Sequence, residues 1–270
     1  MARDFDAAHR QSGYDVALEW GPTGADAITG GDASRSDVVA VVVDVLSFTT
    51  TATVALGRGI EVVPCRWRDE RAEETAERFD AVLAVGRFEQ RRSGIGVSLS
   101  PAAMASVDGV DRVVLPSPNG STICARLAES GVEVVLASLL NAPAVGAYLA
   151  GRMTSGARVR VVPAGERWPD GGLRPAVEDL WGAGAVIEAL VTALPETAGS
   201  LSPEADLART AFGAVRPDLS AALLSCASGR ELVDNGFAED VDVAAGWGSS
   251  NVVPTLRDGV FVDAPREGRS

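Results

Sequence analysis

The sequence predicts an α/β protein, a three-layer α/β/α arrangement around a mainly parallel or mixed sheet. Val38–Val43 is a continuous and mostly β-branched apolar run, which is typical of a strand buried on both faces. Strand-like and helix-like segments alternate after it as far as about residue 195. The chain is 46% hydrophobic but only 5% aromatic, so we expect a core built mainly from Val, Leu and Ala.

The first elements follow each other closely. The strand at 38–43 ends at Asp44, and 49–56 then reads as a short helix that Gly57 closes. The β-branched run at 60–64 is expected to form the next strand. The charged segment 69–79 is expected to be a helix, because Asp69 is a good residue for an N-cap.

The middle of the chain continues the alternation. The apolar run 81–85 predicts a strand, and the Gly, Arg and Ser residues of 86–100 predict a loop after it. A strand at 111–115 then leads into a helix at 119–130.

Four further elements complete the regular part. Strands are expected at 132–136 and 158–162, with a helix at 142–150 between them. The longest helix is expected at 176–194, because Pro175 lies near its first position, where a proline is favourable.

Strands become rare after Pro195. Two helical stretches and one last strand are expected, at 203–212, 217–226 and 259–262. We interpret residues 1–270 as one domain. An organisation in two lobes, about 1–195 and 196–270, is left open by the Ala, Gly and Ser residues of 193–202.

The composition excludes several kinds of chemistry. All 24 basic residues are arginine, so Schiff-base chemistry, a Ser–Lys dyad and a Walker A loop are absent. His9 is the single histidine, which excludes zinc sites built on two or three histidines. An enzyme of this composition would depend on carboxylates, hydroxyls, arginines, backbone amides and a hard metal ion.

The formal charge of −13 argues against nucleic acid and against anionic membranes as partners. Residues 1–6 lack the apolar stretch of a signal peptide, and no apolar run is long enough to span a bilayer. The three cysteines are widely spaced and odd in number, which disfavours a disulfide framework. We therefore expect a cytoplasmic protein, for which a homodimer is left open.

The end of the first buried strand carries candidate functional groups. Asp44 stands where the strand stops, and Ser47 and Thr49 follow it at a helix start. Ligands of open parallel sheets bind at the carboxyl ends of strands, and Mg²⁺ prefers carboxylate and phosphate oxygens. Asp44 is thus a candidate metal ligand and the hydroxyls candidate anion ligands. The alternative is that these residues only cap the helix.

A second group follows the strand at 111–115. Two prolines flank Ser117, and the next helix is expected to start at Asn119, Gly120 and Ser121. Such a segment can bind an anion through hydroxyl, amide and backbone N–H groups. An ordinary turn with a helix cap explains the same residues.

A third group follows the strand at 158–162. Glu166 and Arg167 are adjacent there, and arginine suits phosphate or sulfonate recognition. Glu178 and Asp179 begin the longest helix, and we expect at most one of them to face the site while the other is solvated. Together with Asp44, Glu166 and one of this pair would form a three-carboxylate cluster, enough for Mg²⁺ and a general base. The alternative for Glu166 and Arg167 is a surface ion pair.

Asp240 and Asp242 match the two-aspartate pattern of haloacid dehalogenase phosphatases. That pattern should follow a hydrophobic first strand, whereas Gly236–Glu239 precedes it here near the end of the chain. We therefore do not interpret these residues as the catalytic pair of such an enzyme.

In combination, the motifs resemble those of the 2-phosphosulfolactate phosphatases, the ComB family. The resemblance spans roughly residues 11–262. It rests on segments that occur in the family's order: 14–21, 41–50, 117–121, 137–142, 164–166, 178–179 and 236–241. The resemblance implies an α/β fold of its own kind and Mg²⁺-dependent hydrolysis of a phosphate monoester on a small sulfonated lactate, in coenzyme M biosynthesis.

We carry specific roles onto the matching positions. Asp44, Glu166 and Asp179 are expected to be catalytic, and Asp44, Glu166 and Glu178 to bind Mg²⁺. The residues expected to bind substrate are Ser47, Thr49, Arg87, Ser117, Asn119, Gly120, Ser121, Asn141 and Arg167. The expected partner is a small phosphorylated acid, which in one form also carries a sulfonate group.

The chain also departs from the family pattern. Many members have Arg-Ala-Ser where this chain has Ser47-Phe48-Thr49, so an arginine that could hold an anion is absent there. An alternative function is therefore a non-catalytic protein that binds a small anion or phosphate ester and has diverged from the phosphatases.

Overall fold

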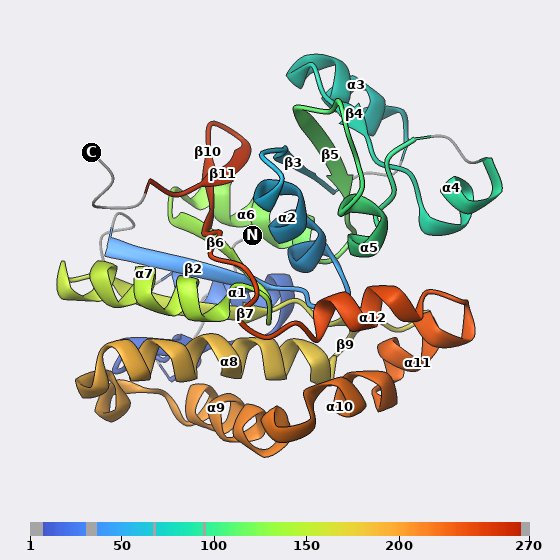
Figure 1. Ribbon diagram of the computed structural model, residues 1–270. Helices are drawn as coiled ribbons and strands as arrows, with labels where there is room; N and C mark the ends of the chain where they lie inside the picture. The colour runs from blue at the N-terminus through green and yellow to red at the C-terminus, as the bar shows by residue number, and fades with distance from the viewer. Residues whose placement is uncertain (1–7, 31–36, 67–68, 94–95, 266–270) are drawn as a thin grey trace.

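A computed structural model describes residues 8–30, 37–66, 69–93 and 96–265 (Figure 1). Its centre is a nine-stranded sheet with the strand order β1-β7-β2-β6-β10-β11-β3-β5-β4. In chain order, the strands of this sheet are β1 (Val16–Leu18), β2 (Val38–Val43), β3 (Glu61–Cys65), β4 (Val82–Leu83), β5 (Arg112–Pro116), β6 (Glu133–Ala137), β7 (Arg158–Pro163), β10 (Pro254–Arg257) and β11 (Val260–Asp263).

The sheet is mixed. Strands β1, β7, β2 and β6 run parallel to one another, and so do β3, β5 and β4. The antiparallel hairpin of β10 and β11 joins the two sets: Thr255 pairs with Val135, and Phe261 pairs with Val62. The predicted sheet type is thereby confirmed.

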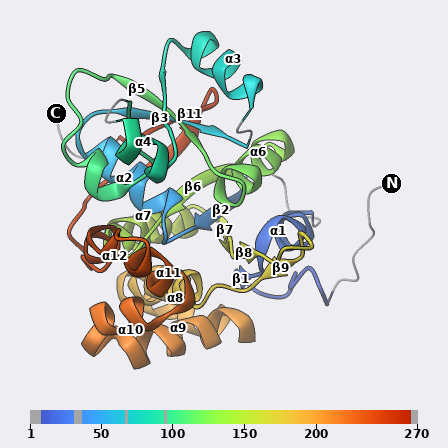
Figure 2. The ribbon, with the colours of Figure 1, turned by 90° about the vertical axis from the view of Figure 1, so that its right-hand side faces the viewer.

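The helices cover both faces of this sheet (Figures 1 and 2). They are α1 (Gly21–Thr29), α2 (Phe48–Gly57), α3 (Glu70–Phe79), α4 (Arg87–Ser93), α5 (Pro101–Met104), α6 (Gly120–Ser130), α7 (Ala142–Thr154), α8 (Val177–Ala193), α9 (Pro203–Val215), α10 (Leu219–Ser225), α11 (Ala227–Asp234) and α12 (Ala238–Ala244). Two 3-10 helices, Pro195–Ser200 and Arg216–Asp218, flank α9.

Strand β2 shows how its sequence forms a central strand. Successive side chains point to opposite faces, so Val39, Val41 and Val43 pack with residues of α7, α8 and α9. Val38, Ala40 and Val42 pack on the other face with residues of α1, α2 and α6. The strand is buried along its whole length, which confirms the predicted three-layer arrangement.

Two strands after residue 195, β10 and β11, lie at the middle of the same sheet, and α12 packs near α5. A boundary near 193–202 would thus separate two strands from the sheet to which they belong.

Several elements differ from the sequence-based expectation. The segment 86–100 was expected to be a loop but contains α4, which buries none of its residues and so has no apolar stripe to reveal it. Strands β1 and β10 and helices α1, α5, α11 and α12 were not expected, and β4 is shorter than predicted. Residues 94–95 of that loop and residues 1–6 lie outside the described part of the chain.

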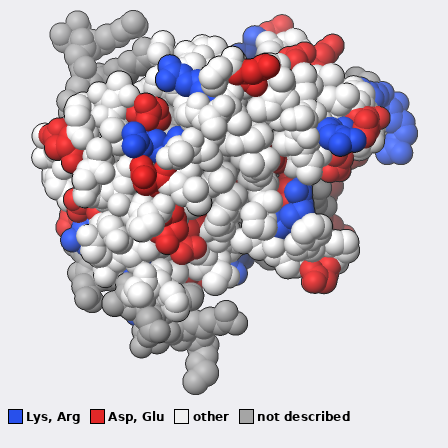
Figure 3. All heavy atoms as spheres, turned by 90° about the horizontal axis from the view of Figure 1, so that it is seen from below, with Lys and Arg blue, Asp and Glu red and all other residues white. Residues whose placement is uncertain are grey.

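Three features of the described residues relate to the predictions made from composition: the surface charges, the length of the apolar helices and the cysteines. On the face seen from below in Figure 3, acidic and basic side chains of the described residues are interspersed. None of the helices in the described ranges is both long and apolar enough to cross a membrane. Cys65, Cys124 and Cys226 are buried, and none of them forms a disulfide within the described residues.

Candidate active site

Asp44 lies where two helices begin. Its Oδ1 accepts a hydrogen bond from the backbone N–H of Phe48 at 3.2 Å, and its Oδ2 accepts one from Gly120 at 3.1 Å. These N–H groups belong to the first residues of α2 and α6, whose positive ends favour a carboxylate. Burial nevertheless raises the pKa of Asp44, the two N–H bonds lower it, and the charge of Glu178 raises it further.

Asp44 opens onto a cavity of about 160 Å³. Six of the residues predicted for the site line this cavity: Asp44, Ser47, Arg87, Ser117, Asn119 and Glu166. The remaining lining residues are Leu46, Phe48, Thr51, Leu99, Leu115, Pro116 and Pro118. The fold therefore brings together the candidate groups that follow β2, β5 and β7.

Glu166 is held by Asn119 at one side of this cavity. Asn119 Nδ2 donates to Glu166 Oε2 at 2.9 Å, and Arg174 is the partner of Glu166 in the β8–β9 hairpin (Glu166–Arg167 and Leu173–Arg174). Burial, followed by the charge of Asp44, raises the pKa of Glu166 to about 7, against the lowering effect of the Asn119 bond. A carboxyl group with such a pKa can accept and release a proton near neutral pH.

Arg87 reaches the cavity from α4. Its Nε donates to Asp240 Oδ2 at 2.5 Å, and its Nη2 donates to Ser47 Oγ. Asp240 was not predicted as a site residue. The only sequence signals for it were its place in segment 236–241 and the two-aspartate pattern, which points to a different enzyme class.

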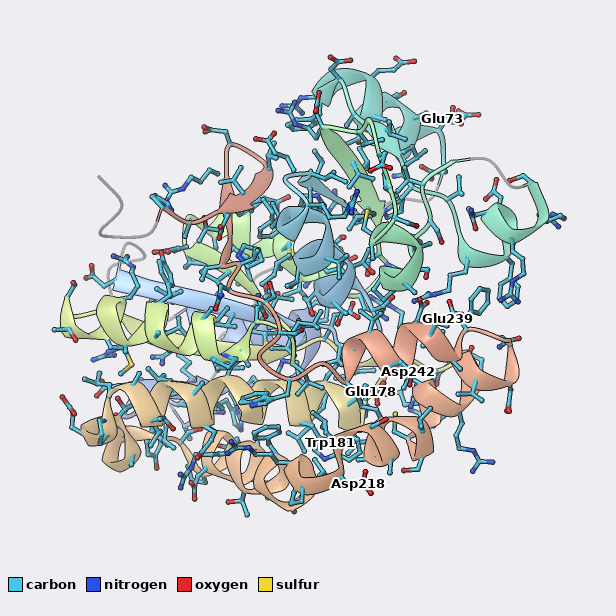
Figure 4. All side chains as sticks on the ribbon, viewed as in Figure 1. Glu73, Glu178, Trp181, Asp218, Glu239 and Asp242 are labelled. Atoms are coloured by element: carbon cyan, nitrogen blue, oxygen red, sulfur yellow. The ribbon has the colours of Figure 1, made fainter. Side chains whose placement is uncertain are left out.

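Glu178 and Asp179 are both buried, with 2% and 4% of their surface exposed. The expectation that one of them is solvated is therefore wrong: Val45 and Gly165 bind Asp179, and Cys226 lies against Glu178. Figure 4 shows Glu178 at this end of α8, close to α12. Neither residue lines the cavity.

Asp179 binds two loops at once. Its Oδ1 accepts from the backbone N–H of Val45 at 2.7 Å, and its Oδ2 accepts from Gly165 at 2.9 Å. It thus joins the residue after Asp44 to the residue before Glu166. Burial, and then the charges of Asp44 and Glu178, raise the pKa of Asp179 well above its usual value.

Three side chains that were predicted to bind substrate form hydrogen bonds with the backbone. Thr49 Oγ1 donates to the Asp44 carbonyl at 2.8 Å, and Ser121 Oγ donates to the Leu115 carbonyl at 3.2 Å. Asn141 accepts from the Ser138 N–H at 2.8 Å and donates to the Val252 carbonyl at 3.1 Å. All three side chains are buried and outside the cavity lining, so the structure does not place them at the cavity, and their role as substrate ligands stays a prediction.

Two further predicted residues shape the surroundings of the cavity. Arg167 is exposed and donates to the Pro118 carbonyl at 3.3 Å, outside the cavity lining. A Cβ atom at Gly120 would lie 2.5 Å from Phe48 Cδ1 and 2.8 Å from Asp44 Oδ2. The glycine is needed because α2 and α6 approach each other closely at Asp44.

The carboxylate oxygen atoms at this site suit a hard metal ion. No group of three or more His, Cys, Asp and Glu side chains in the described ranges is arranged to hold a metal ion. Asp44 and Glu166 nevertheless offer oxygen ligands at the cavity, and the buried Oε2 of Glu178 has no hydrogen-bond partner. Mg²⁺ is commonly held by one or two carboxylates together with substrate phosphate and water. The residues fit Mg²⁺ in that open mode rather than in a closed cage.

Comparison with known proteins identifies the family. A family model described as 2-phosphosulpholactate phosphatase matches residues 28–259. The chain belongs to the 2-phosphosulpholactate phosphatase family. This confirms the resemblance inferred from the motifs and, at the level of the family, the expected class of phosphoric monoester hydrolases.

Curated relatives of this family carry related names. A probable 2-phosphosulfolactate phosphatase of Deinococcus radiodurans is 33% identical over 84% of this chain and 90% of its own length. One from Thermus thermophilus is 34% identical over 86% of this chain and 93% of its own. One from Parasynechococcus marenigrum is 31% identical over 83% of this chain and 90% of its own.

Proposed function

We propose that this protein hydrolyses a small phosphate monoester with the help of Mg²⁺, and that 2-phosphosulfolactate is its substrate, giving 3-sulfolactate and phosphate. The substrate follows the names of the relatives. The observation that carries the proposal is the convergence of Asp44 with the Asn119–Glu166 pair in one cavity, in a chain of this family.

Asp44 and Glu166 would hold Mg²⁺ in this proposal. When bound, the ion would neutralise charge on the phosphoryl oxygens and so stabilise the transition state of hydrolysis. The Ser47 hydroxyl lines the same cavity and accepts from Arg87, so its proton can be donated to those oxygens. The Ser117 hydroxyl also lines the cavity and donates to Asp44 Oδ2 at 3.5 Å, so it would have to turn away from Asp44 to donate to the substrate.

Glu166 would act on the attacking water. Its Oε2 accepts from Asn119 and keeps a second lone pair for the ion, which would leave Oε1 to take the proton of the water. Asp179, predicted to be catalytic, would act as a positioning residue, because its two oxygens fix the backbone beside Asp44 and Glu166. No covalent intermediate is needed.

The biological setting is proposed on the family resemblance alone. It places the reaction in coenzyme M biosynthesis and the protein in the cytoplasm, and it leaves a homodimer open.

The experiment is a phosphate-release assay on metal-free protein with 2-phosphosulfolactate and a panel of small phosphate monoesters. We expect release with added Mg²⁺, and a rate at least about a hundredfold lower in EDTA. Absence of release from every ester, combined with calorimetric binding of the same esters, would overturn the proposal. That outcome would support the alternative of a non-catalytic anion-binding protein.

A further inference from the structure

The cavity contains one positive side chain. Arg87 is the only lysine or arginine among the lining residues in the described part of the chain, whereas Asp44 and Glu166 line it as carboxylates. In the proposed function the carboxylates and Mg²⁺ take the phosphate. Arg87 is then the group that would meet a different anionic part of the substrate.

Asp240 fixes the guanidinium group of Arg87 by a hydrogen bond from outside the cavity lining. It is 1% exposed, and its Oδ2 accepts from Arg87 Nε at 2.5 Å. Its Oδ1 accepts from the Ser100 hydroxyl and from the Ala102 N–H, at the start of α5. Asp240 does not line the cavity, whereas its partner Arg87 does.

Helix α4, which carries Arg87, buries none of its residues and is held mainly by the turn before α12. The rings of Phe88 and Phe237 meet edge to face at 5.2 Å. Arg91 lies 4.1 Å over the Phe237 ring and donates to the carbonyls of Asn235 and Gly236. The position of Arg87 therefore depends on residues 235–240, far away in the sequence.

The remaining donors of Arg87 are suited to an oxyanion. Its hydrogen bonds to Asp240 and Ser47 involve Nε and Nη2, and a guanidinium group has five N–H donors in a fixed plane. A guanidinium held by a buried carboxylate loses little further freedom when it binds a carboxylate or sulfonate.

We propose that Arg87 binds an acidic group of the substrate other than the departing phosphate, and that Asp240 is a positioning residue that holds Arg87 for this contact. The substrate class is then a phosphate monoester that carries a carboxylate, a sulfonate or both. The inference rests on the proposed function.

A matched series of esters tests which acid is recognised. Isopropyl phosphate has neither acid, 2-phospholactate has only the carboxylate, and 2-phosphosulfolactate has both. We expect D240N to lower the ratio of kcat/KM between 2-phosphosulfolactate and isopropyl phosphate by about tenfold or more, mainly through KM. A drop already present with 2-phospholactate assigns the carboxylate to Arg87, and a drop only with the sulfonated ester assigns the sulfonate.

Two comparisons separate positioning from a merely structural role. The double variant R87Q/D240N should lose no more than about twofold beyond R87Q, because both changes remove the same contact. D242N changes an exposed aspartate of the same helix (Figure 4) and should behave as wild type. Equal losses on all three esters in D240N, or fully additive losses in the double variant, would overturn the inference.

A binding measurement keeps the inference separate from the proposed function. Calorimetry with 3-sulfolactate in EDTA needs neither phosphate release nor metal. We expect D240N and R87Q to weaken this binding by about tenfold or more, and D242N to leave it unchanged. If the wild type releases no phosphate but these losses appear, the inference holds and the proposed function fails. Equal binding by wild type and D240N overturns the inference even in an active enzyme.

Discussion

The carboxylate groups of Asp44 and its acidic neighbours repel one another electrostatically. Asp44, Glu166 and Asp179 all have a raised pKa, in each case first because burial removes water and then because of nearby carboxylates. Glu178 adds to the effect, and it also helps to raise the pKa of the Cys226 thiol to about 12, after burial. The cluster is therefore most stable when it binds protons or a cation, which agrees with the proposed Mg²⁺ site.

Replacing Glu166 by glutamine should change how stability depends on pH. The pKa of Glu166 is about 7 in the folded protein, against an ordinary value of 4.5. The folded state then holds a proton that the unfolded state releases, so the contribution of Glu166 is complete below about pH 4.5 and is lost as the pH rises to about 7. In EDTA, we expect the unfolding free energy of wild type relative to E166Q to fall over this range by on the order of 3 kcal/mol.

Chemical denaturation of both proteins at a series of pH values measures this difference, and the comparison cancels the titrating groups that do not interact with Glu166. A difference that stays constant from pH 4.5 to 7, or that grows with rising pH, would contradict the raised pKa.

At the scale of elements, helix α8 connects the site to the core through close packing. A Cβ atom at Gly182 would lie 2.6 Å from Val45 Cγ2, and one at Gly184 would lie 2.0 Å from the carbonyl oxygen of Ala208 in α9. These glycines allow α8 to pack closely against β2 and α9. The start of α8 thereby brings Asp179 to the backbone beside Asp44.

The variant G184A tests this packing. The added methyl group must displace a helix backbone, so we expect a loss of about 3 kcal/mol in the unfolding free energy. Gly151 in α7 is the matched control, because it is exposed and a Cβ atom there would meet nothing within 4 Å. G151A should gain about 0.5–1 kcal/mol. Thermal unfolding of both variants measures these changes in stability. Equal stability of G184A and wild type would refute the close packing of α8 and α9.

Elements with a strong local pattern could be predicted from the sequence, and others could not. The run Val38–Val43 and the cap at Asp69 gave β2 and the start of α3 nearly to the residue. Helix α4 was missed because its residues contact Ser47, Asp240 and the turn at 235–237, all far away in the sequence, and local periodicity does not record such contacts.

The same distinction applies to the candidate site. Asp44, Asn119 and Glu166 follow predicted strands, so their meeting in one cavity could be anticipated from the rule for strand ends. The buried state of both Glu178 and Asp179 could not, because their neighbours Val45, Gly165 and Cys226 come from parts of the chain that lie far apart in the sequence. Hydroxyls such as Thr49 Oγ1 look the same in sequence whether they bind a ligand or a backbone carbonyl.

At the scale of the whole molecule, the site joins both halves of the chain. Residues after β2, β5 and β7 form the cavity, and Asp240 near the end of the chain holds Arg87 from its first half. The net charge of −13 works against an anionic substrate, so the few positive features of the cavity must act locally. These features are Arg87, the proposed Mg²⁺ and hydroxyl donors.

The most direct test of this account is phosphate release from 2-phosphosulfolactate by D44N, measured with Mg²⁺ beside wild type and D242N. Asp44 lines the cavity and is a proposed ligand of the ion, so its loss should lower the rate by about 10³-fold. The melting temperature of D44N confirms that the variant is folded. The account predicts this loss for D44N and a wild-type rate for D242N, and a rate for folded D44N within about tenfold of wild type would contradict it.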